Sequence, residues 1–272
     1  MPAVVLERRI PLHYGHSAGQ VALPQALAVA SVPRQHLVAD GASGANKVLV
    51  IERSGDRIAT FGDLRFPGGI AVNDQRVLIA DTGQSRIVEL DRQGSFIRSW
   101  GRGALHSPRD VALMDDGSIL VADSRAQSVS RIGVQGGVTT LIGTSATDGQ
   151  LGEALAVAAG PQGRIAAYFR DKGLYLIGPE EPPARIPRER FEGGSPREIE
   201  GLVFDPAGNL YAADSKQGEV LVLDAEGNLR QVLPNERRGG RLSKPVDVDF
   251  VGGRLFILDA QALAIWTFRI EG

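Results

Sequence analysis

The feature that most constrains this chain is a short phrase that recurs along its whole length. An apolar strand, a turn and a second apolar strand end in Ala-Asp or Leu-Asp. Five copies close on Asp40, Asp81, Asp123, Asp214 and Asp259. A sixth, altered copy closes on Phe169, and successive end-points lie 41 to 46 residues apart. This period is typical of one four-stranded blade of a β-propeller.

The third copy shows the order of elements within one repeat. Its four apolar runs are Val111–Met114, Ser118–Ala122, Ser128–Ile132 and Val138–Ile142. The links between them have the lengths and residues of hairpin turns, which make consecutive strands antiparallel neighbours. We therefore predict an all-β chain in which residues 1–272 form one six-bladed β-propeller. Each blade has four antiparallel strands, which we letter a to d from the axis outward.

The two ends of the chain predict how the ring closes. The last repeat stops at Gly272 without a fourth strand, while the segment VVLERRIPL precedes the first repeat and belongs to no blade. We predict that this N-terminal strand completes the last blade and thereby removes an open sheet edge. The innermost strands also alternate small or acidic residues with large ones, as in Gly69-Ile70-Ala71-Val72. This alternation fits sheets that converge on an axis.

The second copy, PGGIAVNDQRVLIADTGQSRIVELDRQGSFIRSWG, resembles the NHL-repeat family throughout, and the third and fifth copies match it in strands a and b. The resemblance implies a six-bladed propeller, and it implies a bond between Asp81 and the loop arginine Arg86. It implies no single activity, because the family includes RNA-binding modules, protein-interaction domains, sensor domains and a lyase, with lactonases as neighbours. The zinc-binding histidines of the lyase have no counterpart, because those positions hold Gln25, Gly68, Arg109 and Val246.

Composition narrows the possible functions. The chain has no cysteine, which excludes disulfides and thiolate metal sites, and Lys+Arg 30 against Asp+Glu 32 gives no support to general polyanion binding. No apolar run reaches the ~18–20 residues of a membrane span, and the N-terminus lacks the apolar region of a signal peptide. We expect a cytoplasmic protein without membrane insertion; a removed signal peptide would make it periplasmic or secreted.

Carboxylates suggest two roles. The repeated aspartates end strand b, where a carboxylate can accept hydrogen bonds from N–H groups of the following loop, and we expect that structural role. Asp110, Glu200 and Asp247 lie at or beside the start of strand a, and similar to lactonase-like propellers they could hold a divalent metal at the channel mouth. The competing interpretation is that Asp110 and Asp247 bond the backbone or the neighbouring Arg109 and Lys244.

Basic residues suggest the other candidate site. The d–a and b–c loops of a propeller share one rim, here called the loop rim, and Arg forks suit carboxylates and phosphates. The candidate ligand-binding residues are Arg102, Arg109, Arg185, Arg188, Arg190, Arg197, Arg237, Arg238, Arg241 and Lys244. Interspersed glutamates such as Glu189 and Glu198 leave an ordinary solvated surface as the other interpretation.

These observations favour a non-catalytic binding or scaffold propeller without a cofactor. We expect a protein as its partner, and a small anionic ligand as the next alternative. Nucleic acid is disfavoured because aromatic residues for base stacking are nearly absent from these loops. A metal-dependent hydrolase or lactonase with its site at the channel mouth is the alternative function.

Overall fold

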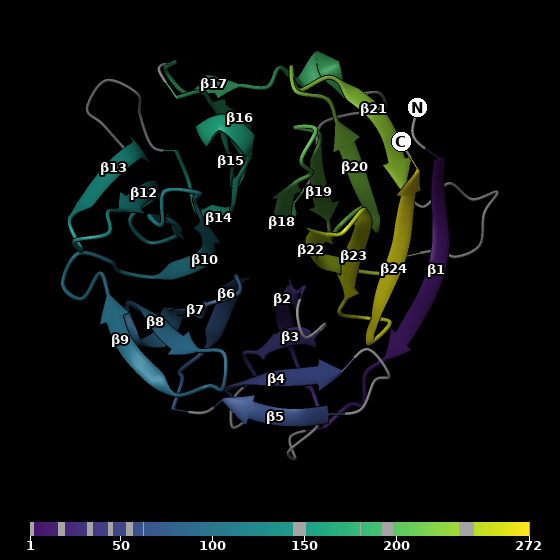
Figure 1. Cartoon of the computed structure of the whole chain (residues 1–272). Helices are drawn as coiled ribbons and strands as arrows, with labels where there is room; N and C mark the ends of the chain where they lie inside the picture. The colour runs from purple at the N-terminus through teal and green to yellow at the C-terminus, as the bar shows by residue number, and fades with distance from the viewer. Residues whose placement is uncertain are drawn as a thin grey trace.

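Six four-stranded antiparallel sheets surround a central axis (Figure 1). This computed structural model describes residues 3–15, 20–31, 35–42, 46–52, 57–61, 63–143, 151–179, 181–191, 198–233 and 242–271. The predicted all-β, six-bladed propeller is confirmed. The helical pieces in the described ranges are short 3-10 turns, η1 (Thr82–Gln84), η2 (Pro161–Gly163) and η3 (Arg188–Arg190). No helix in that part of the chain is long and apolar enough to cross a membrane.

Each blade uses four strands, and five of the six blades are formed from consecutive strands. Blade 1 contains β2 (Pro24–Ala30), β3 (Gln35–Asp40), β4 (Lys47–Glu52) and β5 (Arg57–Phe61). Blade 2 contains β6 (Pro67–Val72), β7 (Arg76–Asp81), β8 (Arg86–Asp91) and β9 (Phe96–Trp100). Blade 3 contains β10 (Pro108–Leu113), β11 (Ile119–Asp123), β12 (Ser128–Ile132) and β13 (Val138–Gly143). Blade 4 contains β14 (Ala154–Ala159), β15 (Ile165–Phe169), β16 (Gly173–Ile177) and β17 (Ala184–Arg185). Blade 5 contains β18 (Ile199–Phe204), β19 (Leu210–Asp214), β20 (Glu219–Leu223) and β21 (Leu229–Leu233). Blade 6 contains β22 (Pro245–Val251), β23 (Arg254–Asp259) and β24 (Ala264–Glu271), together with β1 (Ala3–Pro11).

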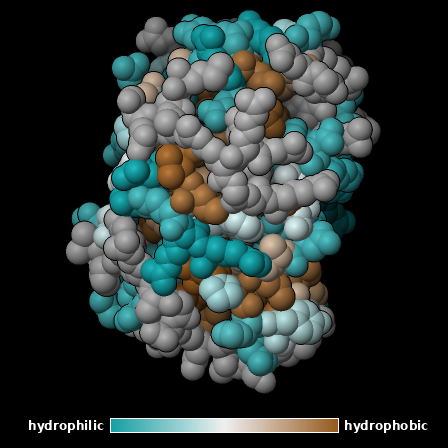
Figure 2. All heavy atoms as spheres, turned by 90° about the vertical axis from the view of Figure 1, so that its right-hand side faces the viewer, coloured by the Kyte–Doolittle hydropathy of each residue, from teal (hydrophilic) through white to brown (hydrophobic). Residues whose placement is uncertain are grey.

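The first strand closes the ring as predicted. β1 pairs antiparallel with β24 from Ala3–Glu271 to Pro11–Ala264, so purple and yellow strands lie side by side in Figure 1. Ile10 of β1 is 1% exposed and joins the core shared by blades 6 and 1. The exposed run Glu7–Arg9 occupies the outer edge, where charge discourages pairing with another chain. Hydrophobic surface on this side of the ring is broken up by hydrophilic residues (Figure 2).

Every strand a begins with an irregularity that the sequence pattern did not reveal. In the third blade the predicted strand c is matched, but strand a starts at Pro108, three residues earlier than expected. The register shifts between Pro108 and Asp110, and the strands a of the other five blades shift at the equivalent place. A β-bulge of this kind inserts one extra residue and re-aims its side chain.

The repeated aspartates hold the loop rim together. The five side chains Asp40, Asp81, Asp123, Asp214 and Asp259 are at most 1% exposed. Asp123 is representative: it accepts bonds from the amides of His106 and Ser107 before strand a, at 2.7 and 2.9 Å, and from Ala126 after strand b, at 3.1 Å. The structural role is confirmed, and each such carboxylate links two loops rather than one.

The aspartate at the end of strand b, with the loop amides that it binds, is here called a clamp. Blades 2 and 4 show two variations of it that the sequence predicted. The Asp81–Arg86 bond is present, with 2.7 Å between Oδ2 and Nε. In blade 4, Phe169 replaces the aspartate and is fully buried, while Arg170 continues the chain and donates its amide to the Glu153 carbonyl. The one blade without a clamp therefore leaves a charged residue at this point of the loop rim.

We predict that closure by β1 contributes strongly to stability. Ile10→Ala removes a buried side chain from the blade 6–blade 1 core and should lower the free energy of unfolding by about 2–4 kcal/mol. Val138→Ala, at a 37% exposed position of another outermost strand, is the control and should cost less than about 1 kcal/mol. Urea unfolding measures both. Equal, small losses in the free energy of unfolding for the two variants would contradict a strong contribution of ring closure to stability.

Candidate functional site

The innermost strands surround a narrow channel of about 170 Å³ along the axis. Its wall is mostly aliphatic, and the charged groups that line it are Asp110, Asp247 and Asp249. Each of these aspartates is half-buried. Since their exposed surface faces a narrow channel, they are poorly solvated even though water can reach them.

The channel aspartates connect neighbouring blades. Asp110 accepts the amide of Val111 in its own strand at 2.8 Å and that of Val157 in blade 4 at 2.9 Å. Asp247 likewise accepts from Val248 at 2.8 Å and from Leu27 in blade 1 at 2.7 Å. Both oxygens of each carboxylate are engaged, so the backbone-bonding interpretation of these two residues is correct.

Burial of these carboxylates alters their acidity. It raises the pKa of Asp110 to about 7, against the opposing effects of its two amide donors and of Arg109. Burial and then the nearby charge of Asp110 raise the pKa of Asp247 well above its usual range. Asp249 accepts from Val29 at 2.6 Å and from Phe250 at 2.7 Å, and burial raises its pKa to about 6.

The three carboxylates nominated as metal ligands do not form one group. Asp110 and Asp247 bond the backbone, whereas Glu200 accepts from Ser215 Oγ at 2.6 Å and lies 3.4 Å from Arg109 Nη2. Within the described ranges, no three His, Asp or Glu side chains are placed to share a metal ion. The donor set is therefore unsuited to the metal centre considered from sequence.

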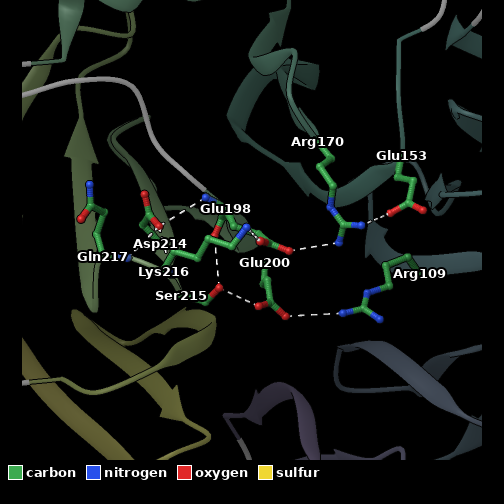
Figure 3. A network of polar contacts seen from close by, with 9 residues as sticks. All are labelled: Arg109, Glu153, Arg170, Glu198, Glu200, Asp214, Ser215, Lys216 and Gln217. Atoms are coloured by element: carbon green, nitrogen blue, oxygen red, sulfur yellow. Dashed lines mark hydrogen bonds and ion pairs between the residues drawn. The ribbon is translucent and has the colours of Figure 1, made fainter.

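Arg109 and Glu200 are brought together by the bulges. Each is the extra residue at the start of its strand, in β10 and β18 respectively. The ion pair thus extends from blade 3 to blade 5, between residues 91 positions apart in sequence. In Figure 3 the two side chains point toward one another.

A charged network surrounds this pair at the channel mouth (Figure 3). We call it the mouth cluster; it consists of Arg109, Glu153, Arg170, Glu198, Glu200, Ser215 and Lys216. Arg170 pairs with both Glu153 and Glu198, and its Nη2 lies 3.0 Å from Glu198 Oε1. Lys216 also pairs with Glu198. Blades 3, 4 and 5 therefore contribute to one connected surface.

Within the mouth cluster, Glu198 and Glu200 are less exposed than the cations they meet, whereas the side chain of Glu153 is 50% exposed beside Arg170. The side chains of Glu198 and Glu200 are 14% and 15% exposed, against 36% for Arg109, 40% for Arg170 and 60% for Lys216. Burial opposes ionisation of Glu198, but Lys216 and Arg170 outweigh it and hold the pKa of Glu198 below its usual value. Ionised Glu198 thus supports two cations, Lys216 and Arg170, that lie nearer the solvent.

Among the nominated arginines whose side chains the structure describes, Arg102 and Arg190 lie apart from Arg109. Arg102 bonds Ser99 at 3.0 Å beside β9, and Arg190 donates to the Glu226 carbonyl in the c–d turn of blade 5. The c–d turns lie on the rim opposite the loop rim, so Arg190 is not beside Arg109. The expected arc over blades 4 to 6 stays a prediction, because most of its side chains lie outside the described ranges.

Two of the remaining nominated residues are exposed. Arg185 lies exposed on β17, and Lys244 lies exposed before β22. Arg197, Arg237, Arg238, Arg241 and the side chain of Arg188 lie outside the described residues.

Sequence reasoning missed Arg170 and Lys216 because it followed the d–a loops. Arg170 is the first residue after strand b of blade 4 and Lys216 is the second after strand b of blade 5, and Arg125 and Lys172 are exposed in similar positions. Cations within three residues of the end of strand b were the signal that the sequence offered. The sequence did not show which residues they pair with, because Glu198 and Glu200 come from a different loop.

Comparisons with known proteins agree on the fold. The sequence model of the family described as "SdiA-regulated" matches residues 71–197, which is less than half of the chain. No curated protein matches the sequence.

Similar solved structures include three propellers of low sequence identity. A protein of unknown function from Bacteroides thetaiotaomicron has a TM-score of 0.77 and 17% identity, over 100% of this chain and 77% of the other. A gluconolactonase from Xanthomonas campestris has a TM-score of 0.68 and 15% identity, over 99% and 100%. A virginiamycin B lyase from Staphylococcus aureus has a TM-score of 0.64 and 15% identity, over 94% and 82%. At these identities the likeness establishes the architecture alone.

We predict that Asp110 makes stability depend on pH. Its pKa is about 7 in the fold and about 3.9 in the unfolded chain, so the folded state binds the proton more tightly. The free energy of unfolding should therefore fall as pH rises from about 4 to 7, and then level off. Asp110→Asn removes this titration and also relieves Asp247 of a neighbouring charge.

Urea unfolding of both proteins across this range measures the effect of Asp110 together with its influence on Asp247, because the remaining carboxylates contribute to both curves. The wild type should lose stability relative to Asp110→Asn between pH 4 and 7. Parallel curves would show that the channel does not perturb this carboxyl.

Proposed function

We propose that the protein is a non-catalytic binding propeller whose mouth cluster recognises an anionic group on a partner protein. The observation that carries the proposal is the layering of charge: the half-buried side chains of Glu198 and Glu200 hold cations that are more exposed than they are. Cations held in place lose less conformational freedom on binding than free side chains do. The surface is thus prepared for a carboxylate or a phosphate.

Donor geometry supports recognition of oxygen anions. Arg109 uses Nη2 for Glu200, and Arg170 uses Nη1 and Nη2 for its two glutamates. A guanidinium carries five N–H donors, so Arg109 keeps donors for an incoming group. Lys216, the most exposed of the three cations, adds a compact charge beside them.

The size of the channel supports a protein partner over an enclosed metabolite. Small-molecule pockets usually measure ~300–1,000 Å³. The channel below the mouth measures about 170 Å³, so a ligand would rest on the loop rim rather than inside the ring. Rim loops on a rigid scaffold are a common location for protein recognition.

The gluconolactonase and the virginiamycin B lyase among the similar structures raise an enzymatic alternative. The carboxylates of this chain give it little support. Asp110 and Asp247 are committed to backbone amides, and Glu200 is committed to Ser215 and Arg109. Binding is therefore the function that the geometry supports best.

We predict that the mouth cluster binds acidic peptide. The test measures fluorescence anisotropy of a labelled hexaglutamate peptide at low salt, with Arg109→Gln/Lys216→Gln as the variant. Glu200 keeps Ser215 in this variant and Glu198 keeps Arg170, so neither glutamate is left without a partner. We expect affinity to fall about tenfold, and to fall further with added salt.

The control is Arg92→Gln/Arg230→Gln, which removes two cations away from the mouth; Arg92 bonds Asn73, and Arg230 pairs with Asp224. It should bind as the wild type does. An equal loss of peptide affinity in both variants would show that binding depends on the net charge of the protein and not on the mouth cluster. Absence of binding by the wild type at low salt would overturn the proposal.

A further inference from the structure

A second cavity lies away from the mouth cluster, between blades 3 and 4. It has a volume of about 490 Å³, which is within the range of small-molecule sites. It opens among the a–b and c–d turns of these blades, on the turn rim, as we call the rim opposite the loop rim. Met114 and Leu141 line it from blade 3, and Ile165 and Ile177 from blade 4. Ile165 and Ile177 belong to the hydrophobic core between the two blades, and Met114 and Leu141 are partly buried and pack against it.

The boundary between blades 3 and 4 lacks a side chain that other neighbouring blades have, one that reaches from one blade to a carbonyl of the next. This helps to explain why the cavity is open. Arg76, Ser118 and Arg164 occupy equivalent positions in blades 2, 3 and 4. Each directly precedes the first residue of strand b that pairs with strand a. Arg76 crosses from blade 2 to the Gly117 carbonyl of blade 3 at 2.7 Å, and Arg164 crosses from blade 4 to the Ala225 carbonyl of blade 5. Ser118 is too short to cross from blade 3 to blade 4.

Blade 4 leaves further space on its own side. Its outermost strand, β17, has two residues, and it pairs with Tyr175 and Leu176 but not with Ile177. Gly160, Gly163 and Gly178 also line the cavity and contribute no side chains to fill it. The pocket is therefore a consequence of the sequence of blade 4 as well as of Ser118.

The polar edge of the pocket has an excess of negative charge. Arg131 is occupied, because it pairs with Asp116 and donates to Ser118 Oγ at 2.9 Å. Hydrogen bonds from Ser118, followed by the charge of Arg131, hold the pKa of Asp116 below its usual value. Asp115 and Glu181 are exposed and have no ion-pair partner among the described residues. Two carboxylates therefore remain uncompensated beside an apolar wall.

From this combination we propose that the pocket binds an amphipathic organic cation, an ammonium or guanidinium group carried on an apolar chain. The chain would lie along Met114, Leu141 and Ile177, and the cation would meet Asp115 and Glu181. This site is independent of the mouth cluster, which lies on the other rim and attracts the opposite charge.

Methionine content provides a probe specific to the pocket. The chain has two methionines, Met1 and Met114, and Met114 lines the cavity. In protein labelled with ¹³C at the methionine methyl groups, titration with n-octylammonium should shift the Met114 signal saturably while the Met1 signal stays unchanged. We expect a dissociation constant of about 1 mM or below. Octanoate, with the same chain and the opposite charge, should leave the Met114 signal in place.

Charge variants test the polar edge. Asp115→Asn/Glu181→Gln should weaken octylammonium binding about tenfold. The matched control, Asp74→Asn/Glu226→Gln, changes an exposed a–b turn and an exposed c–d turn of other blades and should bind as the wild type does. Both pairs alter exposed side chains, and an unchanged melting temperature verifies the fold. An unmoved Met114 signal, an equal response to octanoate, or equal weakening in the control would overturn the proposal.

Discussion

Buried carboxylates that accept backbone amides are the interaction on which the rest of this propeller depends. Loops cannot be buried unless their N–H groups find acceptors, and the aspartate at the end of strand b supplies them on both sides. Asp214 shows the consequence for function. It accepts the amides of Glu198 at 3.3 Å and Lys216 at 3.2 Å. The same carboxylate that shapes the fifth blade thus fixes the backbone beneath two members of the mouth cluster.

A second set of carboxylates organises the axis, and it follows a pattern that repeats twice around the ring. Equivalent positions of the six innermost strands hold, in order, Ala26, Gly69, Asp110, Ala156, Gly201 and Asp247. Each glycine leaves room for the next aspartate, since a Cβ on Gly69 would lie 2.0 Å from Asp110 Oδ1 and one on Gly201 would lie 2.3 Å from Asp247 Oδ1. Channel carboxylates that suggest metal chemistry in the sequence are therefore explained by packing and backbone bonding.

The sequence predicted what repeats and missed what does not. The period follows from a phrase that the chain displays six times, and the closure by the first strand follows from the strand that the last repeat lacks. The Asp81–Arg86 bond was implied by the resemblance of the second copy to the NHL repeat. The pair of Arg109 and Glu200 joins residues 91 positions apart through bulges that leave no mark in the apolar pattern. The pocket between blades 3 and 4 depends on Ser118 replacing a crossing arginine and on the shortness of β17. Such departures from the repeat become interpretable only when neighbouring blades are placed side by side.

The central claim is that buried carboxylates bonded to loop amides hold the blades in place, and Asp123→Ala tests it most directly. The substitution leaves the amides of His106, Ser107 and Ala126 without their acceptor. Urea unfolding, compared with the exposed Asp115→Ala, should show a loss of at least about 3 kcal/mol for Asp123→Ala and less than about 1 kcal/mol for the comparison. A loss below about 1 kcal/mol at Asp123 would contradict the account.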